Sequence, residues 1–151
     1  MAAAPGVFPV WENKFKLGTK GLESTTPTDL KTIAEMETFT VAIDNGVEEW
    51  TPMDTEGWRK RLLTAKSITI TLNGKRCIGD EGNDYAASLA WKSGRACEAP
   101  FEWEFPDGAK LTYSAVVSVT AVGGGDSTNV AGLEMEIMSN GKPTYTAASA
   151  G

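Results

Sequence analysis

The chain has 151 residues, of which 41% are hydrophobic and 23% are charged, and it carries a formal net charge of -6. This length fits one domain, residues 1–151, with little room for a second. The absence of histidine removes Ser-His-Asp and Cys-His nucleophiles and most histidine-based catalytic metal sites. The excess of acidic over basic residues is unlike that of proteins that bind the phosphates of nucleic acids. Composition therefore disfavours an enzyme and disfavours specific binding of nucleic acid.

The N-terminus, Met1 to Pro5, has neither a basic segment nor an apolar core, so we do not expect a signal peptide. The apolar runs fall far short of the ~20 residues that a membrane-spanning helix needs. Cys77 and Cys97 are too far apart for a CxxC motif, and the spacing leaves open whether they pair or remain free. We expect a soluble protein that is made in a cytoplasm.

Alternation of apolar and polar residues predicts strands along most of the chain. Phe101 to Phe105, for example, puts three aromatic rings on one face and Glu102 and Glu104 on the other. Glycine-containing signals of tight turns separate these segments. The predicted strands are 10–17, 35–43, 47–51, 58–64, 67–72, 101–105, 111–122 and 130–138, and the turn signals are Asn45-Gly46, Asn73-Gly74, Asp107-Gly108, Gly123 to Asp126 and Asn140-Gly141.

One segment, about 84–93, is rich in alanine and leucine and predicts a short helix, with Asn83 as its N-cap and Gly94 just after its end. The expected fold is therefore mainly β, a β-sandwich or barrel with one flanking helix. Three stretches fit poorly into a core: an N-terminal arm (1–9), a long loop (18–31) and a C-terminal arm (142–151). Such segments often contact other chains.

Two motifs with a superficial ligand-binding character have simpler interpretations. Gly123 to Asn129 resembles a phosphate loop but lacks the Gly-Lys-Ser/Thr ending and precedes a strand, so it is expected to connect two strands. Gly79 to Asp84 is acidic, but its spacing does not match a calcium loop and a helix-capping role is favoured. We expect no cofactor and no metal.

Paired glutamates are the remaining catalytic option. Glu102 with Glu104 and Glu134 with Glu136 each lie about 6–7 Å apart along one strand face, a spacing that suits glycoside hydrolysis. An exposed, solvated strand face has the same pattern and is favoured, so no catalytic residue is assigned. The five tryptophans predict either a sugar-stacking platform or a core with a subunit interface. Trp103 fits the core, and Trp91 points to a second surface.

The segment 56–143 resembles the tail tube (major tail) proteins of long-tailed bacteriophages. The residues that carry the resemblance are Glu56-Gly57-Trp58, Lys66 to Arg76, Gly82 to Tyr85, Phe101 to Leu111, Gly124 to Glu134 and Gly141 to Tyr145. The resemblance covers over half of the chain and rests on the order and length of these stretches. The first thirty residues match less clearly.

The resemblance implies a β-sandwich with one helix, hexameric rings that stack into a hollow tail tube, and passage of DNA into the host without specific binding. It also implies a virion subunit assembled in the host cytoplasm, with a tape measure protein and tail completion or tip proteins as partners and no membrane. Two alternatives remain. One is a monomeric β-sandwich binding module, for carbohydrate for example, and the other is a tube protein of a related phage-derived or secretion apparatus.

The resemblance also implies a role for the paired glutamates. Six copies at -6 each would carry -36, and an anionic wall keeps duplex DNA from sticking. We expect the acidic strand faces to line the lumen or the tube exterior; their residues are Glu102, Glu104, Glu134 and Glu136. Contacts between subunits or rings are expected from the loop 18–31 and from segment 48–61, with Trp50, Trp58, Trp91, Gly18, Leu22 and Leu30 as candidate contact residues.

Overall fold

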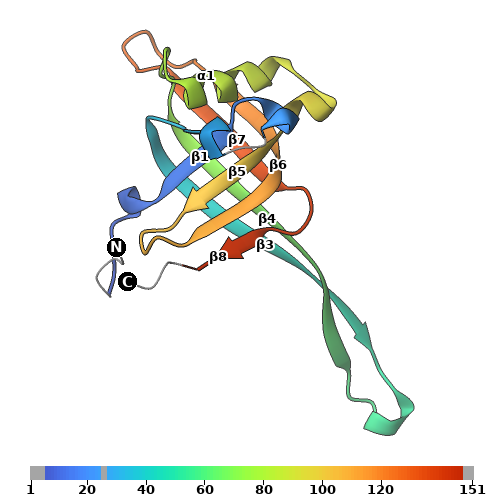
Figure 1. The fold of residues 1–151 in the computed structure, drawn as a ribbon. Helices are drawn as coiled ribbons and strands as arrows, with labels where there is room; N and C mark the ends of the chain where they lie inside the picture. Colours follow the sequence, from blue (N-terminus) through green and yellow to red (C-terminus); the bar gives the residue numbers. More distant parts are fainter. Residues whose placement is uncertain (1–5, 25–26, 148–151) are drawn as a thin grey trace.

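Eight strands form one antiparallel sheet in the computed structural model, which describes residues 6–24 and 27–147 (Figure 1). The strand order is β2-β1-β5-β6-β7-β4-β3, and β8 pairs with the start of β6. The strands are β1 (Lys14–Gly18), β2 (Leu30–Thr32), β3 (Met36–Trp50), β4 (Lys60–Lys75), β5 (Glu98–Glu104), β6 (Lys110–Val122), β7 (Gly132–Ser139) and β8 (Thr144–Thr146). The helices are α1 (Glu81–Ser88) and the 3-10 turns η1 (Val10–Glu12), η2 (Gly21–Glu23), η3 (Pro27–Asp29), η4 (Met53–Thr55), η5 (Leu89–Trp91) and η6 (Gly94–Cys97). The mainly β fold with one short α-helix is the predicted one.

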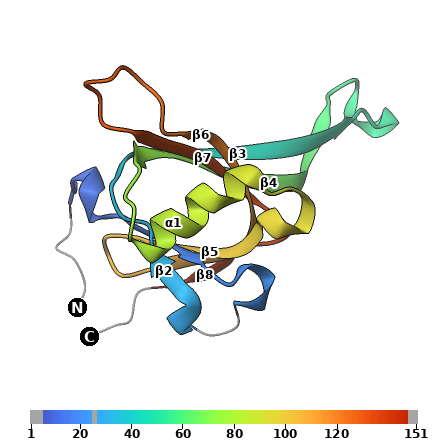
Figure 2. The ribbon, with the colours of Figure 1, turned by 90° about the horizontal axis from the view of Figure 1, so that it is seen from above.

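The sheet curls around a single apolar core. β1 and β3 lie far apart in the strand order, yet the ring centroids of Phe15 on β1 and Phe39 on β3 are 4.8 Å apart. Trp103 on β5 completes this contact, with its ring 5.5 Å from Phe39. Helix α1 lies over one end of the curled sheet and buries Ala86 and Ala87 there (Figure 2). Large residues with almost no exposure fill the interior, namely Leu17, Ile70, Leu72, Phe101, Leu133, Met135 and Ile137.

Two of the predicted turns are wrong. Asn45-Gly46 lies inside β3, which joins the predicted strands 35–43 and 47–51, and Asn73-Gly74 lies inside β4, which joins the predicted strands 58–64 and 67–72 and continues through the glycine. A Cβ on Gly74 would collide with the carbonyl oxygen of Glu35 and lie 2.6 Å from the Cα of Met36. Gly46 lies at a register shift between β3 and β4. These glycines therefore serve a close backbone approach and a bulge, the other common uses of glycine in strands.

The helix begins earlier than predicted because Asp80, not Asn83, is its N-cap. The Asp80 carboxylate accepts from the backbone N–H of Asn83 at 2.9 Å. Asn83 is fully buried, and its side chain donates to the carbonyl oxygens of Ala34 and Lys75. Its oxygen accepts from the backbone N–H of Cys77 at 3.0 Å. Asn83 thus joins α1 to the ends of the strands that it covers.

The rest of the acidic segment also has a structural role. Asp84 lies 2.7 Å from the Arg76 guanidinium, and this hydrogen bond holds the pKa of Asp84 below its usual value. The helix ends at Ser88 and continues as η5, short of the predicted end at residue 93. Cys77 and Cys97 are free thiols.

Two segments that were expected to be loops or arms take part in the sheet. Gly18 belongs to β1 and pairs with Leu30 of β2, so the loop 18–31 begins and ends in paired strands and contains η2 and η3. The C-terminal arm contributes β8 before residue 147, and its last residues lie outside the described part of the chain, as do residues 1–5 of the N-terminal arm. Residues 6–10 are exposed.

Candidate functional site

The distal half of the β3–β4 hairpin projects from the body of the molecule (Figure 1). Its tip is ordered by its own hydrogen bonds: Trp58 N–H donates to the Thr55 carbonyl at 3.0 Å, and the Thr55 hydroxyl donates to the Trp58 carbonyl at 2.7 Å. Glu49 accepts from Arg61 at 2.6 Å and from Arg59 at 3.3 Å.

Large apolar side chains of this hairpin are left in water. Trp58 is 78% exposed and Met53 is fully exposed. We call the set the hairpin patch: Ile43, Val47, Trp50, Met53, Trp58, Leu62 and Leu63. Soluble monomers rarely display an apolar surface of this kind, and such surfaces mark interaction sites. The hairpin is therefore a candidate assembly surface.

A second exposed apolar region lies around η1, on the other side of the body from the hairpin (Figures 1 and 2). It consists of Val7, Phe8, Val10 and Trp11, which we call the N-terminal patch. Trp11 is 80% exposed, although it falls within the predicted strand 10–17. The reason is that residues 10–12 form a 3-10 turn and β1 begins only at Lys14.

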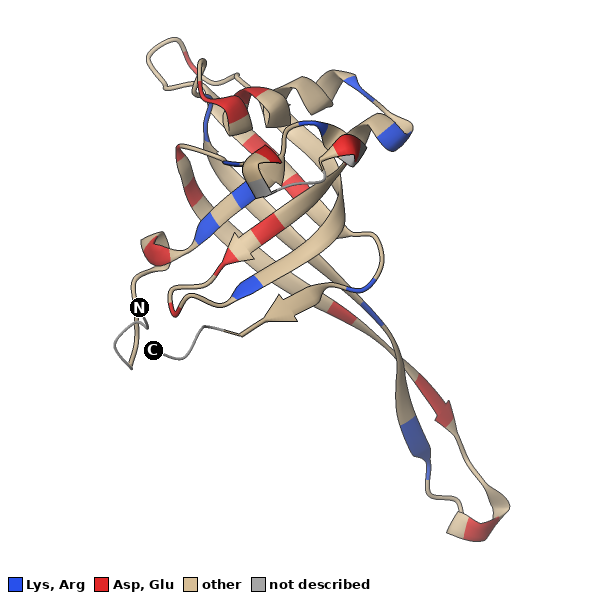
Figure 3. Cartoon of the chain, viewed as in Figure 1, with Lys and Arg blue, Asp and Glu red and all other residues tan. Residues whose placement is uncertain are grey.

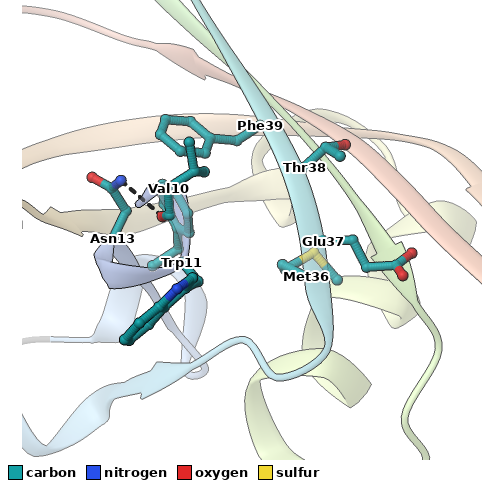
Figure 4. A pocket seen from close by; sticks show the side chains of 8 residues that line it. Val10, Trp11, Asn13, Met36, Glu37, Thr38 and Phe39 are labelled. Atoms are coloured by element: carbon teal, nitrogen blue, oxygen red, sulfur yellow. Dashed lines mark hydrogen bonds between the residues drawn. The ribbon is translucent and has the colours of Figure 1, made fainter. Parts of the chain in front are cut away.

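A pocket of about 340 Å³ adjoins the N-terminal patch. η1 supplies one wall and the start of β3, residues 36–39, supplies the other (Figure 4). Phe39 points toward Val10, whereas Thr38 and Glu37 lie on the far side of the strand. Asn13 fixes this corner because its amide donates to the Val10 carbonyl at 3.0 Å and its oxygen accepts from the Trp103 indole at 2.9 Å. The pocket is thus lined by five apolar residues together with Asn13, Glu37 and Thr38.

The four candidate glutamates all lie on the outward face of the sheet. Their chain neighbours, such as Phe101 on β5 and Leu133 and Met135 on β7, are buried in the core, and successive side chains of a strand point to opposite faces. Figure 3, in which Asp and Glu are red, shows acidic residues spaced along the strands of the sheet. The structure therefore places Glu102, Glu104, Glu134 and Glu136 on one face.

The two pairs differ in their electrostatic surroundings. On β5, Glu102 is 8% exposed and pairs in register with Lys16, whose ammonium lies 3.8 Å away. Glu104 has Lys14 on one side and Lys110 on the other. The β5 pair is thus bordered by cations that offset its charge.

The β7 pair has no basic register partner among the strands that the structure describes. Glu134 lies opposite Asn73 and Ala121, and Glu136 lies opposite Thr71 and Ser118. Lys75 is the diagonal neighbour of Glu134, but its ammonium lies 3.2 Å from Glu37. The outward face at β7 therefore keeps a net negative charge.

The other predicted contact residues lie in different settings. Trp50 is 45% exposed on the hairpin and Trp91 is 82% exposed in η5. Gly18 is buried in β1 and Leu30 is half-buried in β2, where the two pair. Leu22 belongs to η2, and its side chain lies outside what the structure describes.

The exposed tryptophans are distributed over η1, the hairpin and η5, which lie at separate parts of the molecule (Figure 1). A sugar-stacking row needs its rings side by side on one face, so this arrangement does not favour a carbohydrate platform. Trp103 packs between Phe15 and Phe105, as predicted for a core residue. Sequence reasoning missed Trp11, Met53 and Leu62 as exposed apolar residues; the adjacent pair Leu62-Leu63, which cannot both face one side of a strand, was the available signal.

No protein-family model and no curated protein matches this sequence. Solved structures do match. A chain from the tail of an empty gene transfer agent particle with C6 symmetry aligns with a TM-score of 0.72 and 18% identity, covering 93% of this chain and 100% of that one. The chain has the tail tube fold.

Two further solved structures also match over nearly the whole chain. A chain of the sheath–tube complex of an extracellular contractile injection system has a TM-score of 0.60 and 14% identity, over 94% of this chain and 93% of that one. A chain of the anti-feeding prophage cap, which terminates the tube, has a TM-score of 0.60 and 15% identity, over 96% and 95%. Within residues 6–24 and 27–147, no helix is long and apolar enough to cross a membrane.

Proposed function

We propose that this chain is a tail-tube subunit, copies of which form six-membered rings that stack into a hollow conduit for DNA. The observation that carries the proposal is the extent of the structural likeness. It covers 93% of this chain and all of a chain from a C6-symmetric tail, so nearly every element has a counterpart in such an assembly. Because fold alone does not determine function, the surfaces of this chain must also suit assembly.

The hairpin patch supports this proposal. Its side chains have no core of their own chain to pack against, because the hairpin projects beyond the body (Figure 1). Among the described strands, β3 pairs only with β4, so its other edge presents unpaired backbone groups over a long strand. Such an edge invites pairing with other chains unless it is covered. Assembly into a ring and a stack would cover both features.

The acidic face supports a role as the wall of a DNA conduit. We assign the lumen to the outward face at β7, with Glu134 and Glu136 as its charges. Glu102 and Glu104 contribute less there because Lys14, Lys16 and Lys110 border them. Two carboxylates in each of six copies would repel DNA phosphates around the channel. A wall without cationic side chains also displaces no counterions from the DNA, so the usual driving force for DNA binding is missing.

The same proposal places the protein in a virion tail, with a tape measure protein inside the tube and completion or tip proteins at its ends. The support for these partners is the resemblance to tail tube proteins. A subunit of this kind performs no reaction, so we propose structural roles for all four glutamates and no catalytic one.

Electron microscopy of the purified protein tests the proposal. We expect negative-stain images of the concentrated protein to show six-membered rings or tubes built from them. The matched control is Trp58→Asp, which should stay in small particles while keeping the circular dichroism spectrum of the unsubstituted protein. Monodisperse small particles from the unsubstituted protein, at all concentrations and salt levels tried, would contradict the proposal and favour a monomeric binding module.

A further inference from the structure

We infer that the hairpin patch of one copy docks on the N-terminal patch and its adjoining pocket on a second copy. This inference deepens the proposed function and rests on it, because it names which two surfaces of the tube subunit meet. The starting observation is the distribution of exposed apolar residues. Of the fifteen large hydrophobic residues exposed in the described part of the chain, seven lie in the hairpin patch and four in the N-terminal patch. The other four, Ile78, Trp91, Val130 and Tyr145, are scattered singly, as is normal for a protein surface.

The two patches of one molecule cannot cover each other. The hairpin extends away from the body on one side, and the N-terminal segment lies on the opposite side (Figures 1 and 2). The tip is ordered by hydrogen bonds between its own residues, Thr55 and Trp58. The occupant of each patch is therefore another molecule, and the presence of two unlike patches on every copy makes a second copy the consistent occupant.

A contact between unlike patches is heterologous, so every copy uses its hairpin on one neighbour and its pocket on another. Contacts of this kind close into rings or continue as helical filaments. An isologous contact, in which the hairpin patch meets itself, would stop at a dimer. The distribution of apolar surface therefore matches the kind of contact that a stacked tube requires.

The pocket has the chemistry to accept an aromatic side chain from the hairpin. Its volume is about 340 Å³ and its walls include Val10, Trp11, Phe15, Met36 and Phe39. An indole buried there needs an acceptor for its N–H. The start of β3 provides one, because β3 pairs with β4 on one side only among the described strands, and the alternate carbonyls of its other edge point away from the ladder.

Strand β3 runs from one patch to the other, and its length limits the distance between them. β3 carries Phe39 at the pocket and Trp50 at the base of the hairpin tip. Eleven residues at about 3.3 Å each separate them by at most ~36 Å. Copies joined by this contact are therefore displaced from one another by a distance of this order.

Photo-crosslinking in assembled particles tests the inference. Trp58 is replaced by the photoreactive residue p-benzoylphenylalanine, the particles are irradiated, and the linked peptides are identified by mass spectrometry. We expect crosslinks to residues 7–11 or 36–39 of another copy. The control places the same photoreactive residue at Trp91, which is 82% exposed but outside both patches, and should give no link to these segments. If the Trp58 variant does not assemble, Met53 at the tip takes its place.

The outcomes separate the two claims. Rings or tubes that form but link the hairpin to any other segment overturn the docking and leave the tube proposal standing. Failure of the unsubstituted protein to form rings or tubes overturns the proposed function and the docking together.

A mixing experiment gives an independent readout. Trp58→Asp keeps an intact pocket and Trp11→Asp keeps an intact hairpin, so each alone lacks one half of the contact. Sedimentation should detect, only in the mixture, a species larger than either variant forms alone. Unimpaired tubes from Trp11→Asp alone would overturn the docking, because the pocket would then be dispensable.

Discussion

Trp58→Ala is the substitution that separates assembly from folding most clearly. Trp58 is 78% exposed and its backbone hydrogen bonds, not its indole, order the hairpin tip. An exposed substitution away from the core changes stability by about 0.5 kcal/mol or less. We therefore expect thermal unfolding of the monomer to shift by only a few degrees.

The effect on assembly should be much larger. A tryptophan side chain buries about 150–250 Å², so covering the exposed part of Trp58 removes roughly 150 Å² from water, which is worth about 4 kcal/mol at 25 cal/mol per Å². Ordering of the interface consumes part of this gain. Truncation should then cost about 2–4 kcal/mol, the range of an interface hot spot, and weaken each contact by about 30- to 1000-fold.

The critical concentration for assembly, measured by pelleting at increasing protein concentration, reports this change directly. It should rise by at least tenfold in Trp58→Ala. Trp91→Ala removes an equally exposed tryptophan that stands alone, and we expect a change below about threefold. If Trp58→Ala assembled at the concentration of the unsubstituted protein, the hairpin patch would not be an interface and the area argument would be refuted.

Three further predictions follow from the charged and polar residues. Replacing both Glu134 and Glu136 by lysine changes the charge of each copy by +4, so a six-membered ring would go from -36 to -12. Tubes of this variant should retain a labelled DNA duplex in pelleting assays at low salt and release it as the salt concentration rises. The control Glu23→Lys, which lies off the sheet, should not retain the duplex. Asn83→Ala leaves the carbonyls of Ala34 and Lys75 and the N–H of Cys77 without their partner and should lower the free energy of unfolding by about 3 kcal/mol in urea titrations, with Asn45→Ala as the exposed control. Because Arg76 lowers the pKa of Asp84, the stabilisation from this pair is fully present above the ordinary carboxyl pKa and is lost as the pH falls through the lowered value. The free energy of unfolding should therefore fall less steeply with decreasing pH in Asp84→Asn. An unchanged acid limb of this pH dependence would contradict the prediction.

The strand content was predictable because burial on one face leaves a period of two in the sequence. Ile68, Ile70 and Leu72 alternate with threonines, and all three are buried. The pattern stops where the hairpin leaves the body, since neither face is buried there, and the long strands β3 and β4 therefore each looked like two. Turn propensity is local, and strand pairing overrides it: Gly74 pairs with Met36 on one side and Leu133 on the other, and the close approach of Glu35 and Met36 leaves no room for a Cβ.

The two glutamate pairs look the same in the sequence, and only the strand register distinguishes them. Lys16 and Glu102 lie far apart along the chain, and β1 pairs with β5 through a long-range connection that no local pattern reveals. The helix start was misplaced for a related reason. Asn83 is a good N-cap by residue type, but its side chain instead binds the carbonyl of Lys75 at the end of β4 and that of Ala34 between β2 and β3, and Asp80 caps the helix.

The separation between the hairpin and the core has a consequence for how the protein is built up. Apolar residues of the hairpin patch contribute little to folding, because the curled sheet and α1 form the core without them. We therefore expect the subunit to fold as a monomer whose hairpin patch stays exposed until it contacts neighbouring copies. A chain that needed its partner to fold would couple the two steps, whereas we expect this subunit to fold first and to assemble afterwards. The uncompensated negative charge at β7 opposes assembly at short range. Two copies that bring their Glu134 and Glu136 side chains close together repel one another. Assembly is then favoured only in arrangements that bury the hairpin and leave the acidic face in water, and a hollow tube with that face inside satisfies both conditions.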